Sequence, residues 1–256
     1  AGTTIDFGSL APAGAFVELF RRSGLRATLA EARKPMGQHK RDHIRCMLAE
    51  PAIIEQHRAR YGRAPTEEDV EAFFHDFIPL QLKALPAFCT LIPGVVETVQ
   101  FLRRRGVKFA TSTGYNREMT ELCLQAFRAA DILPDFSVCA AEVPQGRPAP
   151  WMVYRAMEAL LVPERAAILK IGDTIADVEE GRNAGCWSVG VSATGNMLGL
   201  EEAALHALAP EERAQRLAQA RGELLQAGAH EVVESFAELP DLLQRLEDRL
   251  HRGEQP

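Results

Sequence analysis

The sequence lacks the features of a membrane-bound, exported or nucleic-acid-binding protein. No apolar run approaches the roughly 18 residues of a membrane-spanning helix, and no basic segment followed by an apolar one marks a secretory signal. Basic residues are not in excess either: the 256 residues carry a formal net charge of −6, with a pI near 5.7. We therefore expect neither a membrane nor a nucleic acid as a partner, and we expect a cytoplasmic location.

Closely spaced cysteines are also missing. The five cysteines form no CxxC pair and show no spacing typical of a metal site, because they are scattered along the chain at Cys46, Cys89, Cys123, Cys139 and Cys186. We expect them to be buried free thiols in a reducing compartment.

The composition that is present, with 46% apolar and 25% charged residues, is that of an ordinary globular protein. The length suits one large domain or one domain with an insertion. From about Ser9 to Lys83 the pattern is helical, without a convincing strand. Within this stretch Thr28-x-x-Glu31 is a capping box, and Pro65 to Asp69 marks a helix start.

From Ile92 to Leu250, short apolar runs alternate with amphipathic stretches. This alternation predicts a parallel sheet covered by helices on both faces. The expected strands are Val107–Gly114, Phe136–Ala140, Ala167–Asp173, Trp187–Val191 and Glu231–Val233. An Ala- and Leu-rich helix is expected over Glu201–Gln226. The predicted fold class is α/β, with a helical insertion near the N-terminus.

The run from Ala167 to Asp173 is the motif around which the chain is organised. It has the pattern of a buried parallel strand that stops at Gly172-Asp173 and turns into a helix, so Asp173 lies at the strand tip, where open α/β sheets bind ligands. Asp177 follows one helical turn later, with no Lys or Arg between the two carboxylates. A cation such as Mg²⁺ would relieve their repulsion. The alternative is that Asp173 caps the helix and Asp177 adds charge to its first turn.

Four signals stand in a fixed order along the chain: Gly2-Thr3-Thr4, Thr113-Gly114, Arg147-Pro148, and Gly172-Asp173 with Asp177. Together they resemble the haloacid dehalogenase superfamily. The match narrows in Ala32-Arg33-Lys34-Pro35-Met36-Gly37, Lys40, Asp42-His43, Thr113-Gly114-Tyr115, Gly146-Arg147-Pro148 and Glu180-Gly181-Arg182-Asn183-Ala184-Gly185. These residues resemble the phosphonatase family, and the likeness covers nearly the whole chain.

The resemblance implies a Rossmann-like parallel core formed by residues 1–8 and 87–256. A helical cap domain of residues 9–86 would be inserted after the first strand. In that family a buried strand ending in Asp-Trp precedes the loop with which this sequence begins, and its Asp is the nucleophile and a Mg²⁺ ligand. A mid-sheet strand cannot be removed without leaving two ladders unpaired and a hole in the core. We therefore expect this strand upstream of Ala1, rather than a pseudoenzyme.

Lys40 is the predicted electron sink of the reaction. A neutral amine can condense with an aldehyde, and the resulting iminium accepts electrons when a C–P bond breaks. The amine must lose its proton near neutral pH, so its pKa must fall from about 10.4 through desolvation or neighbouring cations. Without the family match, Lys40 would be taken as a solvated residue on a helix.

The resemblance assigns the other site residues. His43, on the same helical face as Lys40, would shuttle protons, and Met36 would pack beside the imine; on the residues alone each could equally be an ordinary helix or core residue. Thr113 and Gly114 would bind a phosphoryl oxygen, and Tyr115 would line the site. Arg147 would hold the phosphonate with both arms of its guanidinium. Asp173 and the backbone carbonyl of Ala1 would be Mg²⁺ ligands, and Asp177 would orient Asp173.

The function implied is Mg²⁺-dependent hydrolysis of phosphonoacetaldehyde to acetaldehyde and phosphate, by a homodimer joined through its caps. The main alternative is a capped phosphatase or phosphomutase acting on a small phosphate ester. It is disfavoured because Ala1 stands where such enzymes usually place an acidic Asp. The other alternative is a catalytically silent phosphonate binder, since the sequence as printed contains no nucleophile.

Overall fold

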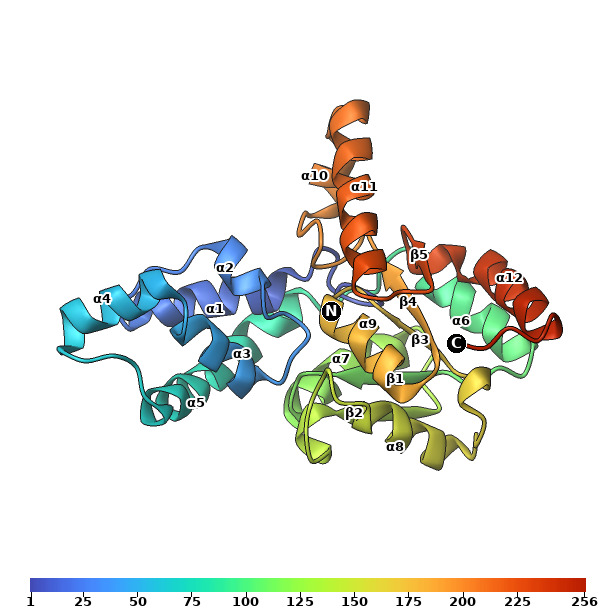
Figure 1. Cartoon of the computed structure of the whole chain (residues 1–256), viewed down its shortest axis with the longest axis horizontal. Helices are drawn as coiled ribbons and strands as arrows, with labels where there is room; N and C mark the ends of the chain where they lie inside the picture. Colours follow the sequence, from blue (N-terminus) through green and yellow to red (C-terminus); the bar gives the residue numbers. More distant parts are fainter.

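The computed structural model describes all 256 residues and divides them into a helical lobe and an α/β part (Figure 1). The lobe consists of α1 (Leu10–Arg22), α2 (Leu29–Arg33), α3 (Lys40–Leu48), α4 (Pro51–Tyr61) and α5 (Glu67–Ala84). The two helix starts predicted in this stretch both exist. Thr28 and Glu31 form a capping box at α2, and Thr66 and Asp69 form one at α5.

The α/β part contains five short parallel strands: β1 (Ala110–Thr113), β2 (Phe136–Cys139), β3 (Leu169–Gly172), β4 (Trp187–Val191) and β5 (Glu231–Val233). Its α-helices are α6 (Val95–Arg104), α7 (Arg117–Ala129), α8 (Trp151–Leu160), α9 (Ile175–Ala184), α10 (Glu202–His206), α11 (Pro210–Gln226) and α12 (Leu239–His251). Single 3₁₀ turns occur at Leu85–Ala87, Ala140–Glu142, Arg165–Ala167 and Phe236–Glu238. The predicted α/β class with a helical insertion is confirmed.

The strands form two sheets rather than one. β1 pairs with β2, and β3, β4 and β5 pair in that order, but β1 and β3 do not pair with each other. Between β1 and β3 lies a cavity of about 410 Å³ whose lining is mostly apolar and includes Phe109, Ile168, Ile171, Met152 and Phe236. The edges of β1 and β3 that face this cavity therefore carry unused backbone donors and acceptors.

Aromatic packing holds the helical lobe together. Phe16 stacks on Phe77 with ring centroids 4.3 Å apart, and Phe20 meets Phe73 edge-on at 5.1 Å. Phe73 and Phe77 are buried in this lobe, whereas Phe74 is only half-buried. The largest apolar cluster of the molecule contains these rings and continues into the α/β part.

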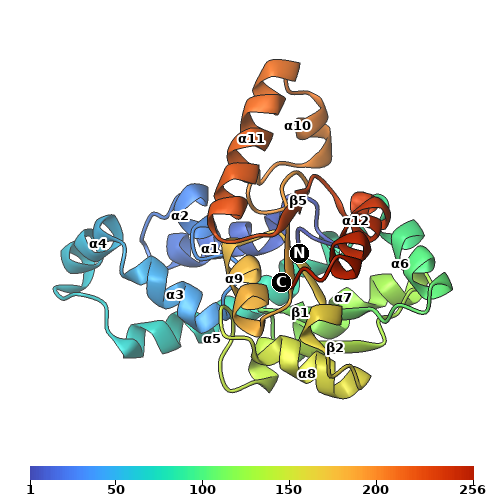
Figure 2. The ribbon, with the colours of Figure 1, turned by 45° about the vertical axis from the view of Figure 1, so that its right-hand side comes forward.

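Three expectations differ from the structure. The strand expected to start at Val107 starts at Ala110, and the helix expected over Glu201–Gln226 is broken into α10 and α11, because Pro210 can begin a helix but cannot continue one. This helical pair projects away from the sheets (Figures 1 and 2). The cysteines are free, as expected, but Cys46 is exposed rather than buried and Cys89 is half-buried. None of the helices combines the length and the apolar character needed to cross a membrane.

Candidate active site

The site lies where the carboxyl ends of β1 and β3 meet the segment that joins α2 to α3. A small cavity of about 40 Å³ is enclosed there. Nine of the ten residues singled out in the sequence line it: Ala1, Met36, Lys40, Thr113, Gly114, Tyr115, Arg147, Asp173 and Asp177. It adjoins two further cavities of about 50 and 140 Å³, with which it shares Ala1 and Thr113.

Lys40 is buried, and its amine contacts a thioether and two aromatic rings. It is the first residue of α3, and its Nζ lies 4.0 Å from the sulfur of Met36 and 5.4 and 5.3 Å from the ring centroids of Phe16 and Tyr115. Burial, with a smaller contribution from the charge of Arg147, lowers the pKa of Lys40 to about 7. A large fraction of this amine is therefore neutral at physiological pH, as a nucleophilic amine requires.

His43 is not among the residues that line the cavity, although it lies one turn from Lys40 on α3. Its ring stacks on Phe16 at 3.7 Å, and its Nε2 donates a hydrogen bond of 2.9 Å to the carbonyl of Ala32. Burial, followed by the charge of Lys40, holds the pKa of His43 well below its ordinary value. The neutral ring keeps a buried Nδ1 that has no hydrogen-bond partner, and the lowered pKa opposes its protonation.

Asp173 follows β3 directly and is a buried carboxylate without a cationic partner. Its Oδ1 accepts a hydrogen bond of 2.8 Å from the Thr3 hydroxyl, and its Oδ2 accepts one of 2.8 Å from the Asn196 backbone N–H. Burial, followed by the charge of Asp177, raises the pKa of Asp173. A carboxylate that is oriented by two donors but not neutralised suits a bound cation. No group of three or more His, Cys, Asp or Glu side chains forms a metal cage here or elsewhere.

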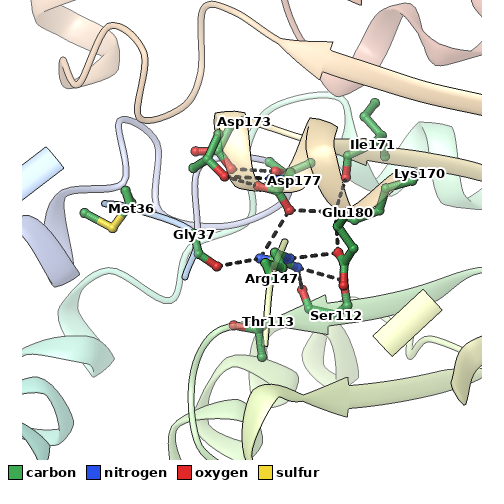
Figure 3. A network of polar contacts seen from close by, with 12 residues as sticks. Met36, Gly37, Ser112, Thr113, Arg147, Lys170, Ile171, Asp173, Asp177 and Glu180 are labelled. Carbon is green, nitrogen blue, oxygen red and sulfur yellow. Dashed lines mark hydrogen bonds and ion pairs between the residues drawn. The ribbon is translucent and has the colours of Figure 1, made fainter. Parts of the chain in front are cut away.

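Asp177, on the first turn of α9, is neutralised by two cations, which corrects the expectation of an uncompensated carboxylate pair. Its Oδ1 lies 2.6 Å from Nζ of Lys170 and 3.2 Å from Nη1 of Arg147 (Figure 3). Burial alone would raise the pKa of Asp177, but Arg147 and Lys170 outweigh it and hold the pKa below its usual range. The alternative in which Asp173 caps this helix is also wrong, because the capping side chain is Thr174.

Arg147 is the centre of this buried network (Figure 3). Its Nε donates to Glu180 Oε2 at 2.8 Å, and its Nη2 donates to the carbonyl and hydroxyl of Ser112 at 2.8 and 2.7 Å. Its Nη1 is 3.2 Å from Asp177 and 3.5 Å from the Gly37 carbonyl. The bidentate fork that was predicted for a phosphonate is thus engaged by the protein in this structure, and the longest of its contacts is the one to Gly37.

Thr113, Gly114 and Tyr115 form the turn after β1. The Thr113 hydroxyl accepts a hydrogen bond of 3.2 Å from the Tyr115 N–H. Gly114 lies so close to the segment between α2 and α3 that a Cβ on it would be 2.6 Å from the Gln38 carbonyl, which leaves room only for glycine. The Tyr115 ring is buried and its hydroxyl has no partner.

Sequence reasoning assigned no role to the residues that support the site. Lys170 is hidden in an apolar run, and Glu180 entered only as part of the family match, yet both are buried in the network around Arg147. Thr3 and Asn196, which orient Asp173, each lie in a loop next to the site. A lysine in the middle of an otherwise apolar strand is the one available signal, since most buried lysines are paired with a carboxylate.

Comparisons with known proteins show which family the chain belongs to. A family model described as haloacid dehalogenase-like hydrolase matches residues 5–185. Over all of its length the chain is 42% identical to phosphonoacetaldehyde hydrolase of Syntrophobacter fumaroxidans, of which it covers 92%. It is likewise 41% identical over its full length to phosphonoacetaldehyde hydrolase of Paraburkholderia phytofirmans, covering 96% of that protein.

Among solved structures, a phosphonoacetaldehyde hydrolase-like protein from Oleispira antarctica matches with a TM-score of 0.98. The two sequences are 40% identical, and the match covers 100% of this chain and 93% of the other.

Proposed function

The chain belongs to the haloacid dehalogenase-like hydrolases and, within them, to the phosphonoacetaldehyde hydrolase family; we propose that it hydrolyses the C–P bond of phosphonoacetaldehyde to acetaldehyde and phosphate. The observation that carries the proposal is the pairing of two unlike groups across one small cavity. Lys40 offers a buried amine without a carboxylate partner, and Asp173 offers a buried carboxylate without a cation. An aldehyde suits the amine, and a phosphonate held by a cation suits the carboxylate.

The proposed reaction begins at Lys40. Its neutral amine attacks the aldehyde carbon, and the adduct loses water to form an iminium; the family resemblance assigns the proton transfers of this step to His43. When the C–P bond breaks, its electron pair moves toward the iminium nitrogen and leaves an enamine, while the phosphoryl group passes to an aspartate carboxylate. Water then hydrolyses the protonated enamine to acetaldehyde and free Lys40, and a second water hydrolyses the aspartyl phosphate to phosphate.

We propose that the aspartate stands at the end of a strand upstream of Ala1, and that this strand occupies the cavity between β1 and β3. The cavity has an apolar lining, and β1 and β3 offer unpaired strand edges on its two sides. Ala1 and Asp173 line a neighbouring cavity of about 140 Å³, which shares Phe109, Ile171 and Phe236 with the larger one. A strand that ended there would deliver a carboxylate to the same cavity as Lys40.

Mg²⁺ is the proposed cofactor, and when bound it would neutralise charge on the phosphonate oxygens. Asp173, the Ala1 carbonyl and the upstream aspartate would hold it. Asp177 would act behind Asp173, since its own charge is already taken up by Lys170 and Arg147. The N–H groups at Gly114 and the Thr113 hydroxyl are proposed to bind phosphonate oxygens, and Nη1 of Arg147, whose contact to Gly37 is long, would join them.

Assembly and location are proposals that rest on the family alone. We propose a cytoplasmic homodimer joined through the helical lobes. Light scattering of the purified full-length protein tests the assembly, because a mass of one chain at micromolar concentration would exclude a stable dimer.

Reductive trapping tests the function. The full-length protein is mixed with phosphonoacetaldehyde and borohydride, which should fix the substrate-derived carbon chain on Lys40, located by mass spectrometry of peptides. Lys40→Arg should abolish the adduct and lower acetaldehyde release at least about 1,000-fold, within the range for loss of a covalent catalytic group. Lys83→Arg, an exposed lysine on α5, is the matched control and should behave as the parent protein does.

The outcomes separate the alternatives. An adduct solely on another lysine would remove Lys40 from the mechanism. Hydrolysis of p-nitrophenyl phosphate that survives Lys40→Arg, without cleavage of the aldehyde, would support a phosphatase of small esters instead. Binding of phosphonoacetaldehyde with neither turnover nor an adduct would support a silent binder.

A further inference from the structure

Arg33, the last residue of α2, crosses from the helical lobe to the α/β part. Its Nη1 donates to the carbonyl of Gly8 at 3.0 Å and to Oδ1 of Asn196 at 3.1 Å, and its Nη2 donates to the carbonyl of Gly199 at 3.2 Å. A weaker contact of 3.5 Å reaches the Ser9 carbonyl. Every acceptor is a neutral oxygen, so the guanidinium is held by shape and by the number of its contacts rather than by an ion pair.

The contact surface is built for this side chain. Gly199 has a φ of +64°, and a Cβ on it would lie 2.4 Å from Cζ of Arg33, so a larger residue there would displace the guanidinium from its acceptors. Asn196 returns the contact, since its Nδ2 donates to the Arg33 carbonyl at 3.2 Å. The two residues are therefore joined by two hydrogen bonds that run in opposite directions.

Asn196 also touches the site from its backbone. Its N–H donates to Oδ2 of Asp173 at 2.8 Å, so the loop that grips Arg33 is the loop that orients this carboxylate. On the other side, Arg33 leads directly into the segment that carries Met36 and Lys40 over the cavity. One pair of side chains thus adjoins both halves of the site.

From this arrangement we propose that Arg33 and Asn196 are a pair of positioning residues that fasten the helical lobe over the α/β part, joining the enclosure of Lys40 to the orientation of Asp173. The proposal extends the function proposed above and rests on it for its effect on catalysis. The fastening itself does not depend on that function.

The contact between the lobe and the α/β part affects Lys40 because residues of both parts exclude water from its amine. Phe16, Met36 and the neutral His43 enclose it from the lobe, and Tyr115, Arg147 and Asp173 face it from the α/β part. If the lobe is not held down, water reaches the amine and the largest cause of its lowered pKa is lost. The pKa of Lys40 then rises toward its ordinary value near 10.4.

Two measurements on the full-length protein test the pair. The first is amide hydrogen exchange without substrate. In Arg33→Ala, the amides of residues 34–38 and 195–199 should exchange at least tenfold faster, while those of α5 should not change. The second is the pH midpoint of borohydride trapping, which should rise by about one unit, so that the neutral fraction of Lys40 at pH 7 falls about fivefold.

Three further variants sharpen the test. Arg26→Ala makes the same change at an exposed arginine of the lobe and should match the parent protein in both measurements. Asn196→Ala keeps its backbone N–H but loses the grip on Arg33, and should give the same faster exchange. Arg33→Lys retains the charge without the fork and should lie between the parent and Arg33→Ala; it also serves if Arg33→Ala fails to fold.

The results separate the two proposals. Unchanged exchange in both segments, or faster exchange spread evenly over the whole chain, would overturn the fastening role. A parent protein that forms no adduct would overturn the proposed function, while exchange would still decide the role of Arg33. An adduct that forms with an unchanged pH midpoint in Arg33→Ala would refute the link to Lys40.

Discussion

Two lysines are buried within the walls of the site, and they have opposite surroundings. Lys40, from the helical lobe, is 5% exposed and faces two aromatic rings and a thioether. Lys170, on β3, is 8% exposed, and its Nζ lies 2.6 Å from Asp177 and 3.4 Å from Glu180. Equal burial therefore gives one amine that can react and one that is held as a structural cation. The difference lies in whether a carboxylate is within reach.

The two aspartates of the site repeat this contrast. Asp177 has two cations and a pKa that is held down by them, whereas Asp173 has none and a pKa that burial raises. The cations of Arg147 and Lys170 and the carboxylates of Asp177 and Glu180 pair with one another and form a closed network in the α/β part. The groups without a partner, Lys40 and Asp173, face the cavity, and they are the ones to which we assign chemistry.

The largest effects on activity and stability are expected from two separate single variants, one at each aspartate. Asp173→Asn should lower C–P hydrolysis about 1,000-fold, because a cation's stabilisation of the transition state is worth several kcal/mol. It should not destabilise the metal-free protein, since it removes a buried charge that has no partner. Asp177→Asn should instead destabilise the fold by about 3–5 kcal/mol, because it leaves two buried cations underneutralised.

Thermal unfolding with and without MgCl₂ measures both halves of this comparison. Mg²⁺ should raise the Tm of the parent protein and of Asp177→Asn but not that of Asp173→Asn. A Mg²⁺-dependent rise that persists in Asp173→Asn would show that the cation is bound elsewhere.

Replacing each of the two lysines by methionine should change the stability of the fold in opposite directions. Lys40→Met should stabilise the fold at pH 7 or below, because it removes a buried ammonium without a partner. Lys170→Met should destabilise it by about 3–5 kcal/mol, because it breaks a buried ion pair.

The lowered pKa of Lys40 also makes the stability of the fold depend on pH. The pKa of Lys40 is about 7 in the folded state and about 10.4 in the unfolded state, so between these pH values the unfolded state binds one more proton than the folded state.

The parent protein should therefore gain stability relative to Lys40→Met as the pH rises from about 7 to about 10. Urea unfolding at several pH values checks this, with Lys83→Met as the exposed control. A constant difference between the parent and Lys40→Met over that range would mean that Lys40 is not desolvated in solution.

The sequence predicted the groups that face the cavity better than the groups behind them. Thr113 and Asp173 stand at the ends of strands, and parallel strands bring such ends together whatever the details of packing. Arg147 and the cap residues Met36 and Lys40 were assigned to the same place only by the resemblance to a family. Local pattern carries no information on how an inserted lobe closes over a sheet.

The contacts that the sequence did not predict share a different cause. Lys170 and Asp177 are seven positions apart and meet only because α9 folds back along β3, and Arg33 and Asn196 are more than 160 positions apart. Their partners depend on tertiary packing, which a periodic pattern does not encode. The break between α10 and α11 is of another kind, because Pro210 is itself a helix-start signal inside an otherwise continuous helical pattern.

The smallest effect should come from Arg147→Lys, a change that keeps the charge of the closed network but not its geometry. A lysine cannot donate to Glu180, Ser112 and Asp177 at once from three separate nitrogens, as the guanidinium does. Because a hydrogen bond to a charged group is worth about 1.5–3 kcal/mol, the expected loss in kcat/KM is about 10- to 100-fold.

Kinetics of acetaldehyde release measure this loss, and Arg155→Lys, an exposed arginine on α8, is the matched control. The trapping of Lys40 by borohydride should be retained, since the positive charge near the amine is kept. Parent-like kinetics would show that the fork is not needed, and loss of the adduct would show that the network shapes the surroundings of Lys40 as well. Loss of the adduct would therefore contradict the assumption, made in the other predictions, that the ion-pair network and the surroundings of Lys40 act independently.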